Sequence, residues 1–163
     1  NPRIMHINKK LFLFLFLISS MSCSEVNDEP NDTSSSIIWN GSLITFEKSD
    51  GADPTAEANQ DRLTSNVWIT RGNNGGQIYN IAKENTSNKD NSPTGTAWAI
   101  GTLDQIESLS FNKFRVAVGN PKDVVGKDLV MHLIEDDIYL SVKFSSWSSG
   151  QKGGFAYSRS TAN

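Results

Sequence analysis

The chain has 163 residues, enough for one domain and a tail. Its 37% hydrophobic and 20% charged residues are typical of a globular protein rather than a disordered one. It carries 15 basic and 18 acidic residues and has no basic stripe, so nucleic acid is not an expected partner. A single cysteine cannot form an internal disulfide, so the fold has to rest on its hydrophobic core.

A secretory signal is the first feature along the chain. Two lysines precede an unbroken apolar run at residues 11–18, and small residues lead from there to Cys23. These are the charged, apolar and cleavage regions of an export signal, and the run is far shorter than the about 20 residues that a membrane span needs. We therefore expect residues 1–22 to be a signal peptide, with translation beginning at Met5.

Cys23, the single cysteine, indicates how this signal is processed. The stretch LFLFLFLISSMSC resembles a bacterial lipoprotein signal, in which Cys23 would become the lipidated N-terminus. Ser20 departs from the resemblance, because an aliphatic residue is commonest at that position. Ser20 and Ser22 also satisfy ordinary signal-peptidase cleavage, which would release the protein. We predict lipidation of Cys23 and a lipid anchor in a membrane, with plain secretion as the alternative.

Residues 23–35 form a polar, acidic segment in which Val26 is the last apolar residue. Such a composition cannot bury enough surface to fold, so it predicts a flexible tether. The acidic residues directly behind the cysteine resemble the surface-export signal of Bacteroidetes lipoproteins. That resemblance implies an outer-membrane or cell-surface location, and a plain solvated linker is the alternative.

From residue 36 the pattern changes to short apolar runs separated by turn residues. Nine such runs, with almost no helical periodicity, predict an all-β domain over residues 36–163, an antiparallel β-sandwich or jelly roll. The predicted strands are SIIWNG (36–41), SLITFEK (42–48), NVWITRG (66–72), GGQIYNIA (75–82), TAWAIG (96–101), LSFNKFRVAV (109–118), DLVMHLI (128–134), DIYLSVKFSSW (137–147) and GGFAYSRS (153–160).

Local signals suggest how some of these strands are connected. Asn40-Gly41, between the first two runs, is a strong signal for a type I′ hairpin. A short helix is expected after Asp53-Pro54, where an N-cap acid precedes a proline at the first helical position. A second short helix is expected over residues 102–109.

Two runs predict strands near the centre of the fold. In DIYLSVKF (137–144) every second side chain is apolar and is expected to face the core. LVMHLI (129–134) is apolar on both faces, as a strand covered on both sides would be. His132, within this run, is therefore expected to be a buried, hydrogen-bonded core residue.

No catalytic constellation is evident. His132 is the only histidine after the signal, which excludes a zinc site built from several His or Cys ligands, and no G-x-S-x-G nucleophile elbow is present. Glu135, Asp136 and Asp137 are interpreted as a hairpin turn, with paired carboxylates for glycoside hydrolysis as the alternative. We expect a protein that is not an enzyme.

The segment SDGADPTAEANQD gathers oxygen ligands in a loop between strands: Asp50, Asp53, Glu57, Asn59 and Asp61. Calcium takes about six to eight oxygens from such loops. The spacing does not match an EF-hand, however, and aspartates also favour turns and helix caps for local reasons. Structural calcium held by Asp50, Asp53, Glu57 and Asp61 is one hypothesis, local turn and cap roles are the other, and no further cofactor is expected.

Aromatic and glycine-rich stretches give the remaining candidates for a binding site. Sugar rings stack on exposed aromatic faces, although most aromatic residues of a sandwich lie in its core. Trp68 and Tyr139 alternate with aliphatic neighbours and are therefore the candidate ligand-binding residues. RGNNGGQ and SSGQKGGF lack the Walker pattern and are expected to be loops at one end of the sandwich.

Three stretches, ANQDRLTSNVWITRGNNGGQIYN, SPTGTAWAIG and DIYLSVKFSSWSSGQKGGFAYSRS, resemble a module that recurs in secreted bacterial proteins, often beside cell-surface sorting signals. The resemblance spans nearly all of residues 36–161; it implies an extracellular β-domain and no site residues. We expect a surface lipoprotein whose β-sandwich binds an extracellular glycan or another ligand without catalysis. A glycan-active enzyme and a structural or adhesive surface protein are the alternatives.

Overall fold

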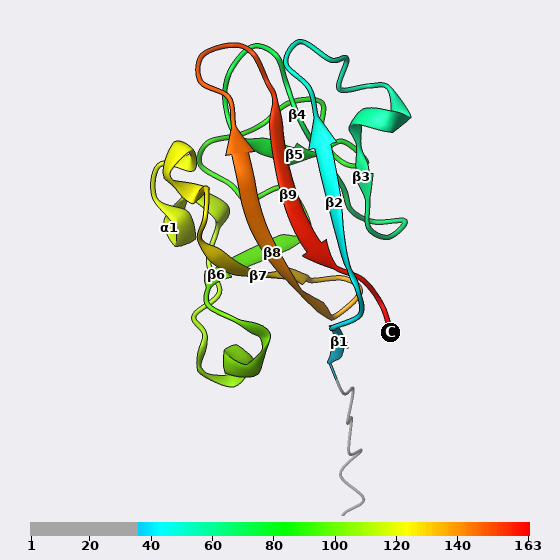
Figure 1. Ribbon diagram of the computed structural model, residues 1–163, viewed down its shortest axis with the longest axis vertical. Helices are drawn as coiled ribbons and strands as arrows, with labels where there is room; N and C mark the ends of the chain where they lie inside the picture. Colours follow the sequence, from blue (N-terminus) through cyan, green and yellow to red (C-terminus); the bar gives the residue numbers. More distant parts are fainter. Residues whose placement is uncertain (1–35) are drawn as a thin grey trace, which may run out of the picture. The chain divides into compact units, whose positions relative to one another are not determined.

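Residues 36–163 form an all-β fold in the computed structural model, which describes this part of the chain (Figure 1). Strands account for most of the regular structure and the helices are short, as predicted. The predicted signal peptide, Cys23 and the tether lie outside the described residues. Within residues 36–163, no helix is long and apolar enough to cross a membrane.

Two β-sheets make up the fold. The larger has the order β2-β9-β8-β7-β6, with β1 paired to β8 outside this path, and the smaller has the order β3-β4-β5. Every pairing is antiparallel except that of β1 with β8. The strands are β1 (Ile37–Trp39), β2 (Leu43–Lys48), β3 (Asp61–Arg62), β4 (Trp68–Arg71), β5 (Ile78–Asn80), β6 (Thr96–Ile100), β7 (Asp128–Leu133), β8 (Ile138–Trp147) and β9 (Phe155–Ser160).

Side chains from both sheets form one hydrophobic cluster. Ile69 and Ile78 come from the small sheet, and Met131 and Leu140 from the large one, and all four are fully buried. Paired aromatic rings run through the same cluster: Trp98, Phe114, Phe144, Trp147, Phe155 and Tyr157. The two sheets therefore pack as a sandwich, which is the predicted fold class.

The two central strands confirm their predicted patterns. The core-facing side chains of β8 are Ile138, Leu140, Val142 and Phe144. The intervening side chains face outward, as alternation requires. In β7 the adjacent Val130 and Met131 are both fully buried, so the middle of this strand is covered on both faces, whereas His132 is only half-buried and Ile134, which follows the strand, is 52% exposed.

β1 and β2 do not form the predicted hairpin. β1 pairs in parallel with the start of β8, with Ile38 opposite Tyr139, whereas β2 pairs with β9. The φ angle of Gly41 is not positive, so Asn40-Gly41 cannot be the predicted type I′ turn. A Cβ at Gly41 would lie 2.3 Å from the backbone oxygen of Ala162. This glycine therefore permits a close approach to the C-terminal segment instead of a hairpin turn.

The predicted strand at residues 109–118 is wrong over its second half. Asn112 makes only an isolated bridge with Trp98, and α1 (Phe114–Val118) follows it. Phe114 and Val118 are four residues apart and both point into the core, which is helical spacing. Gly119, with a φ of 77°, ends the helix in a conformation that favours glycine.

Short 3₁₀ segments stand in both places where a helix was expected, η1 (Glu57–Asn59) and η2 (Leu103–Ser108). The predicted start of the first is wrong, because η1 begins after Ala56 and Asp53-Pro54 lies in the turn before it. η2 begins with a capping box, in which the side chains of Thr102 and Gln105 satisfy each other's backbone N–H groups. A third 3₁₀ segment, η3 (Pro121–Val124), has proline in its first turn and was not predicted.

Candidate functional site

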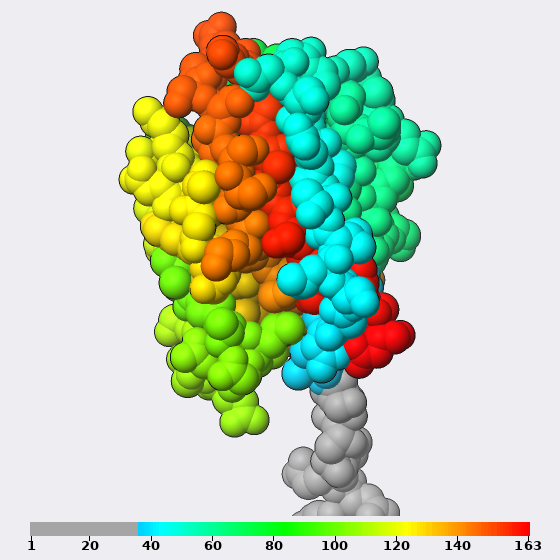
Figure 2. Space-filling model, viewed as in Figure 1, coloured from blue at the N-terminus to red at the C-terminus, as the bar shows by residue number. Residues whose placement is uncertain are grey.

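The outward face of the six-stranded sheet carries two adjoining hollows, which together we name the outer-face groove. The first has a volume of about 200 Å³ and is lined by residues of β7 and β8, Ser158 of β9, Leu43 of β2 and residues 101–103 at the start of η2. The second has a volume of about 470 Å³ and lies between β1 and residues 103–108. Leu103 lines both hollows, so the groove follows η2. Figure 2 shows this face, with η2 in green and β1 and β2 in blue and cyan.

Polar and apolar side chains are mixed in the first hollow. Ser141 and Lys143 of β8 and Ser158 of β9 line it from outward-facing strand positions. Leu43, which is 67% exposed, and Leu103 supply apolar walls.

The charged pair in this hollow is exposed. Lys143 Nζ donates to Asp128 Oδ1 at 2.9 Å across the β7–β8 ladder, and both side chains are more than half exposed. An exposed ion pair of this kind contributes at most about 1 kcal/mol to stability. Both groups can therefore turn toward a ligand at little cost in folding free energy.

Tyr139 lies on the same outward face, but its ring is packed. His132 of β7 stacks on it with ring centroids 4.1 Å apart and planes 4° apart, and Phe111 contacts both rings edge-on. Ile38 of β1 lies opposite Tyr139 on the other side. Tyr139 is therefore part of an aromatic cluster rather than a bare stacking face, and it lines neither hollow of the groove.

His132 is half-buried on the outward face of β7, which corrects its expected place in the core. Alternation accounts for the difference, because its neighbours Met131 and Leu133 take the core-facing positions. Its Nε2 lies 3.0 Å from Asp137 Oδ1, so the expected hydrogen bond is present. Asp137 ends the β7–β8 turn with a φ of 48°, a left-handed conformation that aspartate adopts more readily than most residues.

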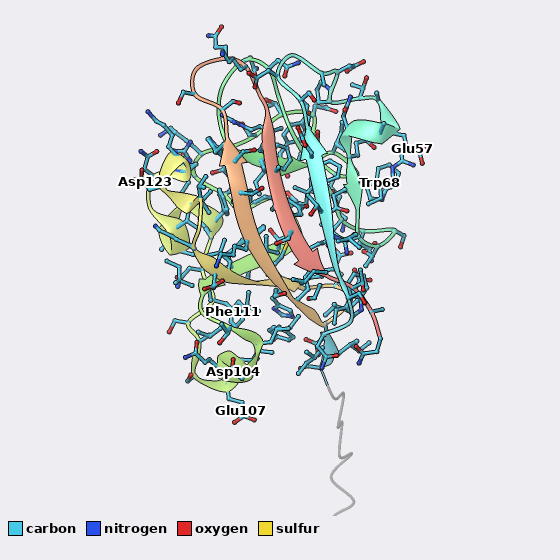
Figure 3. All side chains as sticks on the ribbon, viewed as in Figure 1. Glu57, Trp68, Asp104, Glu107, Phe111 and Asp123 are labelled. Carbon is cyan, nitrogen blue, oxygen red and sulfur yellow. The ribbon has the colours of Figure 1, made fainter. Side chains whose placement is uncertain are left out.

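Trp68, the other predicted stacking residue, is half-buried on the outer face of the small sheet (Figure 3). The guanidinium carbon of Arg62 lies 4.3 Å from the Trp68 ring centroid, and the indole N–H donates to the backbone oxygen of Thr64 at 2.9 Å. Glu57 holds Arg62 there through an ion pair of 2.9 Å. One face of Trp68 is thus occupied by a cation. Trp68 and Tyr139 lie on different sheets and do not form one binding platform.

Asp61, one of the four predicted calcium ligands, is a buried link between the two sheets. One carboxylate oxygen accepts hydrogen bonds from Arg159 Nε at 2.7 Å and from the Tyr157 hydroxyl at 2.6 Å. The other accepts one from Arg159 Nη2 at 2.8 Å. This bidentate pairing joins β3 to β9 and occupies both oxygens of Asp61.

Asp50, Asp53 and Glu57 also have separate partners. Asp50 pairs with Lys152 at 3.6 Å, and Glu57 forms the ion pair described above. Hydrogen bonds from the backbone N–H and hydroxyl of Thr55 hold the pKa of Asp53 below its usual value. Among residues 36–163, no three His, Cys, Asp or Glu side chains are grouped as metal ligands. The structure therefore does not assemble the predicted calcium site, because these acids serve turns and ion pairs.

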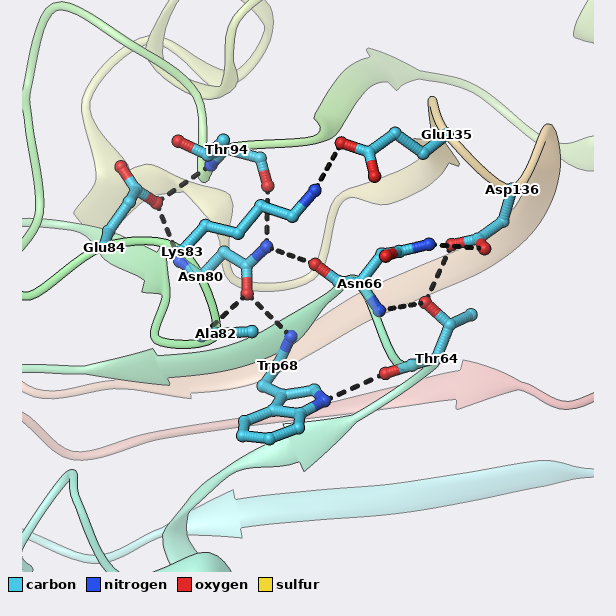
Figure 4. Close-up of polar contacts among 10 residues, drawn as sticks. All are labelled: Thr64, Asn66, Trp68, Asn80, Ala82, Lys83, Glu84, Thr94, Glu135 and Asp136. Atoms are coloured by element: carbon cyan, nitrogen blue, oxygen red, sulfur yellow. Dashed lines mark hydrogen bonds and ion pairs between the residues drawn. The ribbon is translucent and has the colours of Figure 1, made fainter.

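The acidic group at residues 135–137 forms the predicted turn between β7 and β8. Glu135 pairs with Lys83, and Asp136 accepts hydrogen bonds from Thr64 Oγ1 at 2.7 Å and Asn66 Nδ2 at 2.9 Å (Figure 4). These contacts tie the turn to two neighbouring loops. Glu135 and Asp136 are therefore engaged in structural contacts.

Asn80 is the buried centre of the same network (Figure 4). Its Nδ2 donates to the backbone oxygens of Asn66 and Thr94 at 2.7 and 2.8 Å, and its Oδ1 accepts from the Trp68 N–H at 2.8 Å. A buried amide with its donors and acceptor satisfied holds three chain segments in place.

The two glycine-rich loops pack against each other, so their expected location at one end of the sandwich is confirmed (Figure 1). A Cβ at Gly153, whose φ is 76°, would lie 2.2 Å from Asn73 Oδ1 and 2.7 Å from the Gly72 oxygen. Lys48, which is 1% exposed, donates to Asn73 Oδ1 at 2.9 Å and to the Gly153 oxygen at 3.3 Å. Burial, and then the charge of Arg71, lowers the pKa of Lys48. Close packing accounts for the glycine at position 153.

Sequence reasoning did not single out the groove. Alternation in β8 placed Ser141 and Lys143 on an outward face, but nothing local indicated that η2 would bring Leu103 over that face. Comparison with protein-family models, with curated proteins and with solved structures finds no match to this chain.

Proposed function

We propose that this protein is an exported surface lipoprotein whose β-sandwich binds an extracellular glycan in the outer-face groove, without catalysis. The signal at residues 1–22 would direct export, and a lipid on Cys23 would anchor the chain to the membrane. The observation that carries the proposal is the groove itself, an open hollow of mixed polarity on the face of a hydrogen-bonded sheet.

The side chains of the groove suit the chemistry of sugars. Ser141 and Ser158 offer hydroxyl groups, Asp128 is an acceptor and Lys143 a donor, so sugar hydroxyls find partners of both kinds. Leu43 supplies an apolar wall for the C–H surface of a ring. The second hollow continues the groove along η2, which suits a chain of sugars better than a single ring. The hydrogen-bonded sheet fixes the backbone positions of these residues before binding, which lowers the entropic cost.

A glycan-active enzyme is the second candidate, and one observation favours it. Asp104 and Glu107 of η2 both line the second hollow (Figure 3). Hydrolysis needs two carboxyl groups about 5–10 Å apart, one of them held in a setting that raises its pKa. Asp104 and Glu107 are both exposed to solvent, and the acids at 135 and 136 hold neighbouring loops. Binding therefore has more support than hydrolysis.

A structural or adhesive role is the third candidate. β2 is an edge strand, and its residues Leu43 and Ile44 are 67% and 42% exposed. An open edge with apolar side chains can pair with another protein. The same Leu43 lines the groove, so its exposure also suits the first proposal.

A glycan-array screen of the full chain, run with and without calcium, tests the proposal. We expect binding to a defined set of glycans, unchanged by calcium. Asp128→Asn with Lys143→Gln should weaken binding by about tenfold or more, because hydrogen bonds from charged groups to the ligand are lost. Asp90→Asn with Lys89→Gln removes a matched exposed ion pair outside the groove and should have no effect. Absence of binding to any sugar would contradict the proposal, and release of cleaved sugar would favour the enzyme.

A further inference from the structure

A third hollow, which we name the basic hollow, has a volume of about 170 Å³. Three of the side chains that line it are cationic: Arg71 of β4, Arg115 of α1 and Lys122 of η3. Asn120 and Ser148 add polar groups to the lining. No carboxylate lines this hollow.

Arg71 is 3% exposed and donates hydrogen bonds only to neutral groups. Its Nε donates to the backbone oxygen of Gly76 at 3.2 Å. Its Nη1 donates to the backbone oxygens of Ser148 and Gly154 at 3.0 and 2.9 Å. The guanidinium lies 4.1 Å from the ring centroid of Trp147. Nη2 makes no hydrogen bond within residues 36–163. Arg71 lines the basic hollow, and Nη2 is not fully enclosed by protein, because no side-chain nitrogen or oxygen of residues 36–163 is both fully buried and without a hydrogen bond.

Arg115 is positioned by a buried amide. Its Nε donates to Gln77 Oε1 at 2.9 Å. Gln77 is 1% exposed and is itself fixed, because its Nε2 donates to the oxygens of Asn88 and Asn91 at 2.9 and 2.7 Å. The amide oxygen is thereby directed at Arg115, while Nη1 and Nη2 of Arg115 bind no acceptor in the described part of the chain.

The positive charge of the basic hollow is not balanced locally. None of its three cations forms an ion pair with an acid in residues 36–163. Burial lowers the pKa of Arg71 and the more distant Asp50 raises it, but Asp50 pairs with Lys152 and lines a different hollow. Asp123 is exposed on η3 and does not line the hollow (Figure 3). A buried cation without a counter-charge is costly, and a bound anion would offset that cost.

We propose that the basic hollow binds a tetrahedral oxyanion, a sulfate or phosphate group, either as the free ion or as an ester on a sugar. The free N–H groups of two guanidiniums match such oxygens in a forked geometry, and Lys122 adds a point charge. Three cations can contact several oxygens of one anion at once, and a sulfate or phosphate group offers more oxygens than a carboxylate. The basic hollow shares no residue with the outer-face groove, so this inference does not depend on glycan binding there.

The proposal is tested by titrating the full chain with inorganic sulfate and phosphate, with the ionic strength held constant by chloride. Binding is followed by NMR of the arginine Nε–H signals. We expect saturable shifts at Arg71 and Arg115 and none at Arg62, which is held by Glu57 elsewhere. Arg115→Gln and Lys122→Gln should each weaken binding by about tenfold, the effect of losing one charge-assisted contact. Lys113→Gln removes one charge outside the hollow and should leave the affinity unchanged.

A second titration with sulfated and phosphorylated monosaccharides distinguishes the two sources of the anion. Tighter binding of an ester than of the free ion assigns the site to a modified sugar, and equal affinity assigns it to the free ion. Absence of saturable shifts with every anion, or an affinity unchanged by Lys122→Gln, would overturn the proposal. Lys122 is exposed, so this variant keeps the test valid even if Arg115→Gln unfolds.

Discussion

Replacing Asp61 with alanine would remove the anion that links the two sheets. The Asp61 and Arg159 side chains are 6% and 8% exposed, and Asp61 accepts two hydrogen bonds from Arg159 and one from Tyr157. In the variant the Arg159 guanidinium stays buried without its counter-charge, and the Tyr157 hydroxyl loses its acceptor. Removing one partner of a buried pair in this way costs about 3–5 kcal/mol of unfolding free energy.

Denaturant and thermal unfolding would measure the loss. For a domain of this size, 3–5 kcal/mol corresponds to a fall in Tm of roughly 10–20 °C. The double variant Asp61→Leu with Arg159→Met replaces both charges by apolar side chains and should recover most of the stability. A loss below about 1 kcal/mol for Asp61→Ala, or a double variant less stable than the single one, would refute the reasoning.

Calcium provides a control for the same residue. Because Asp61 is bound to Arg159 and Tyr157, calcium should leave the unfolding midpoint of the unsubstituted protein unchanged. If calcium stabilises the unsubstituted protein and this effect disappears in Asp61→Ala, the hypothesis of a calcium site at residues 50–61 would be supported instead.

A crowded glycine, a buried phenol and the lone cysteine each allow a direct test. Gly153→Ala should lower the unfolding free energy by about 2 kcal/mol, because its φ is 76° and a Cβ would lie 2.2 Å from Asn73 Oδ1; a change below about 0.5 kcal/mol would contradict the close packing of the loops. Burial, and then the charge of Asp61, raises the pKa of Tyr157 well above 10.0. The neutral Tyr157 phenol therefore contributes fully to stability at a pH below its pKa in the unfolded chain. This contribution is lost as the pH rises toward its higher pKa in the folded protein. Burial also raises the pKa of Tyr79 and Tyr139, but less, so phenolate absorbance should show one of the three tyrosines staying neutral after the other two ionise, until the protein unfolds; ionisation of all three together before unfolding would argue against this burial. Cys23→Ala should release the protein from membranes, and unchanged membrane association would exclude the lipid anchor.

Local pattern predicted strand positions well where side chains alternate. β8 and the acidic turn before it follow directly from residues 135–144. Strand pairing was less predictable, because the partners lie far apart in sequence. Asn40-Gly41 carries a hairpin signal, yet its neighbours pair with β8 and β9. The sequence of Phe114–Val118 is apolar enough for a strand or a helix. The helix buries both Phe114 and Val118, and Phe114 packs against Trp98.

The candidate sites depend even more on distant contacts. The acids at 50–61 suggested a metal site, but Asp61 finds its partner Arg159 98 residues further along the chain. Trp68 was rightly placed on an outward face, although Arg62 covers it. Arg71, Arg115 and Lys122 belong to three elements, so no sequence motif indicates that they line one hollow.

Glycan binding in the outer-face groove is tested most directly by NMR chemical-shift mapping of the full chain with a glycan identified on the array. We expect saturable shifts of the backbone amides of Ser141, Lys143 and Ser158, which line the groove, and their loss in Asp128→Asn with Lys143→Gln. Shifts centred on Trp68 or on the β8–β9 loop, with the groove amides unchanged, would contradict it.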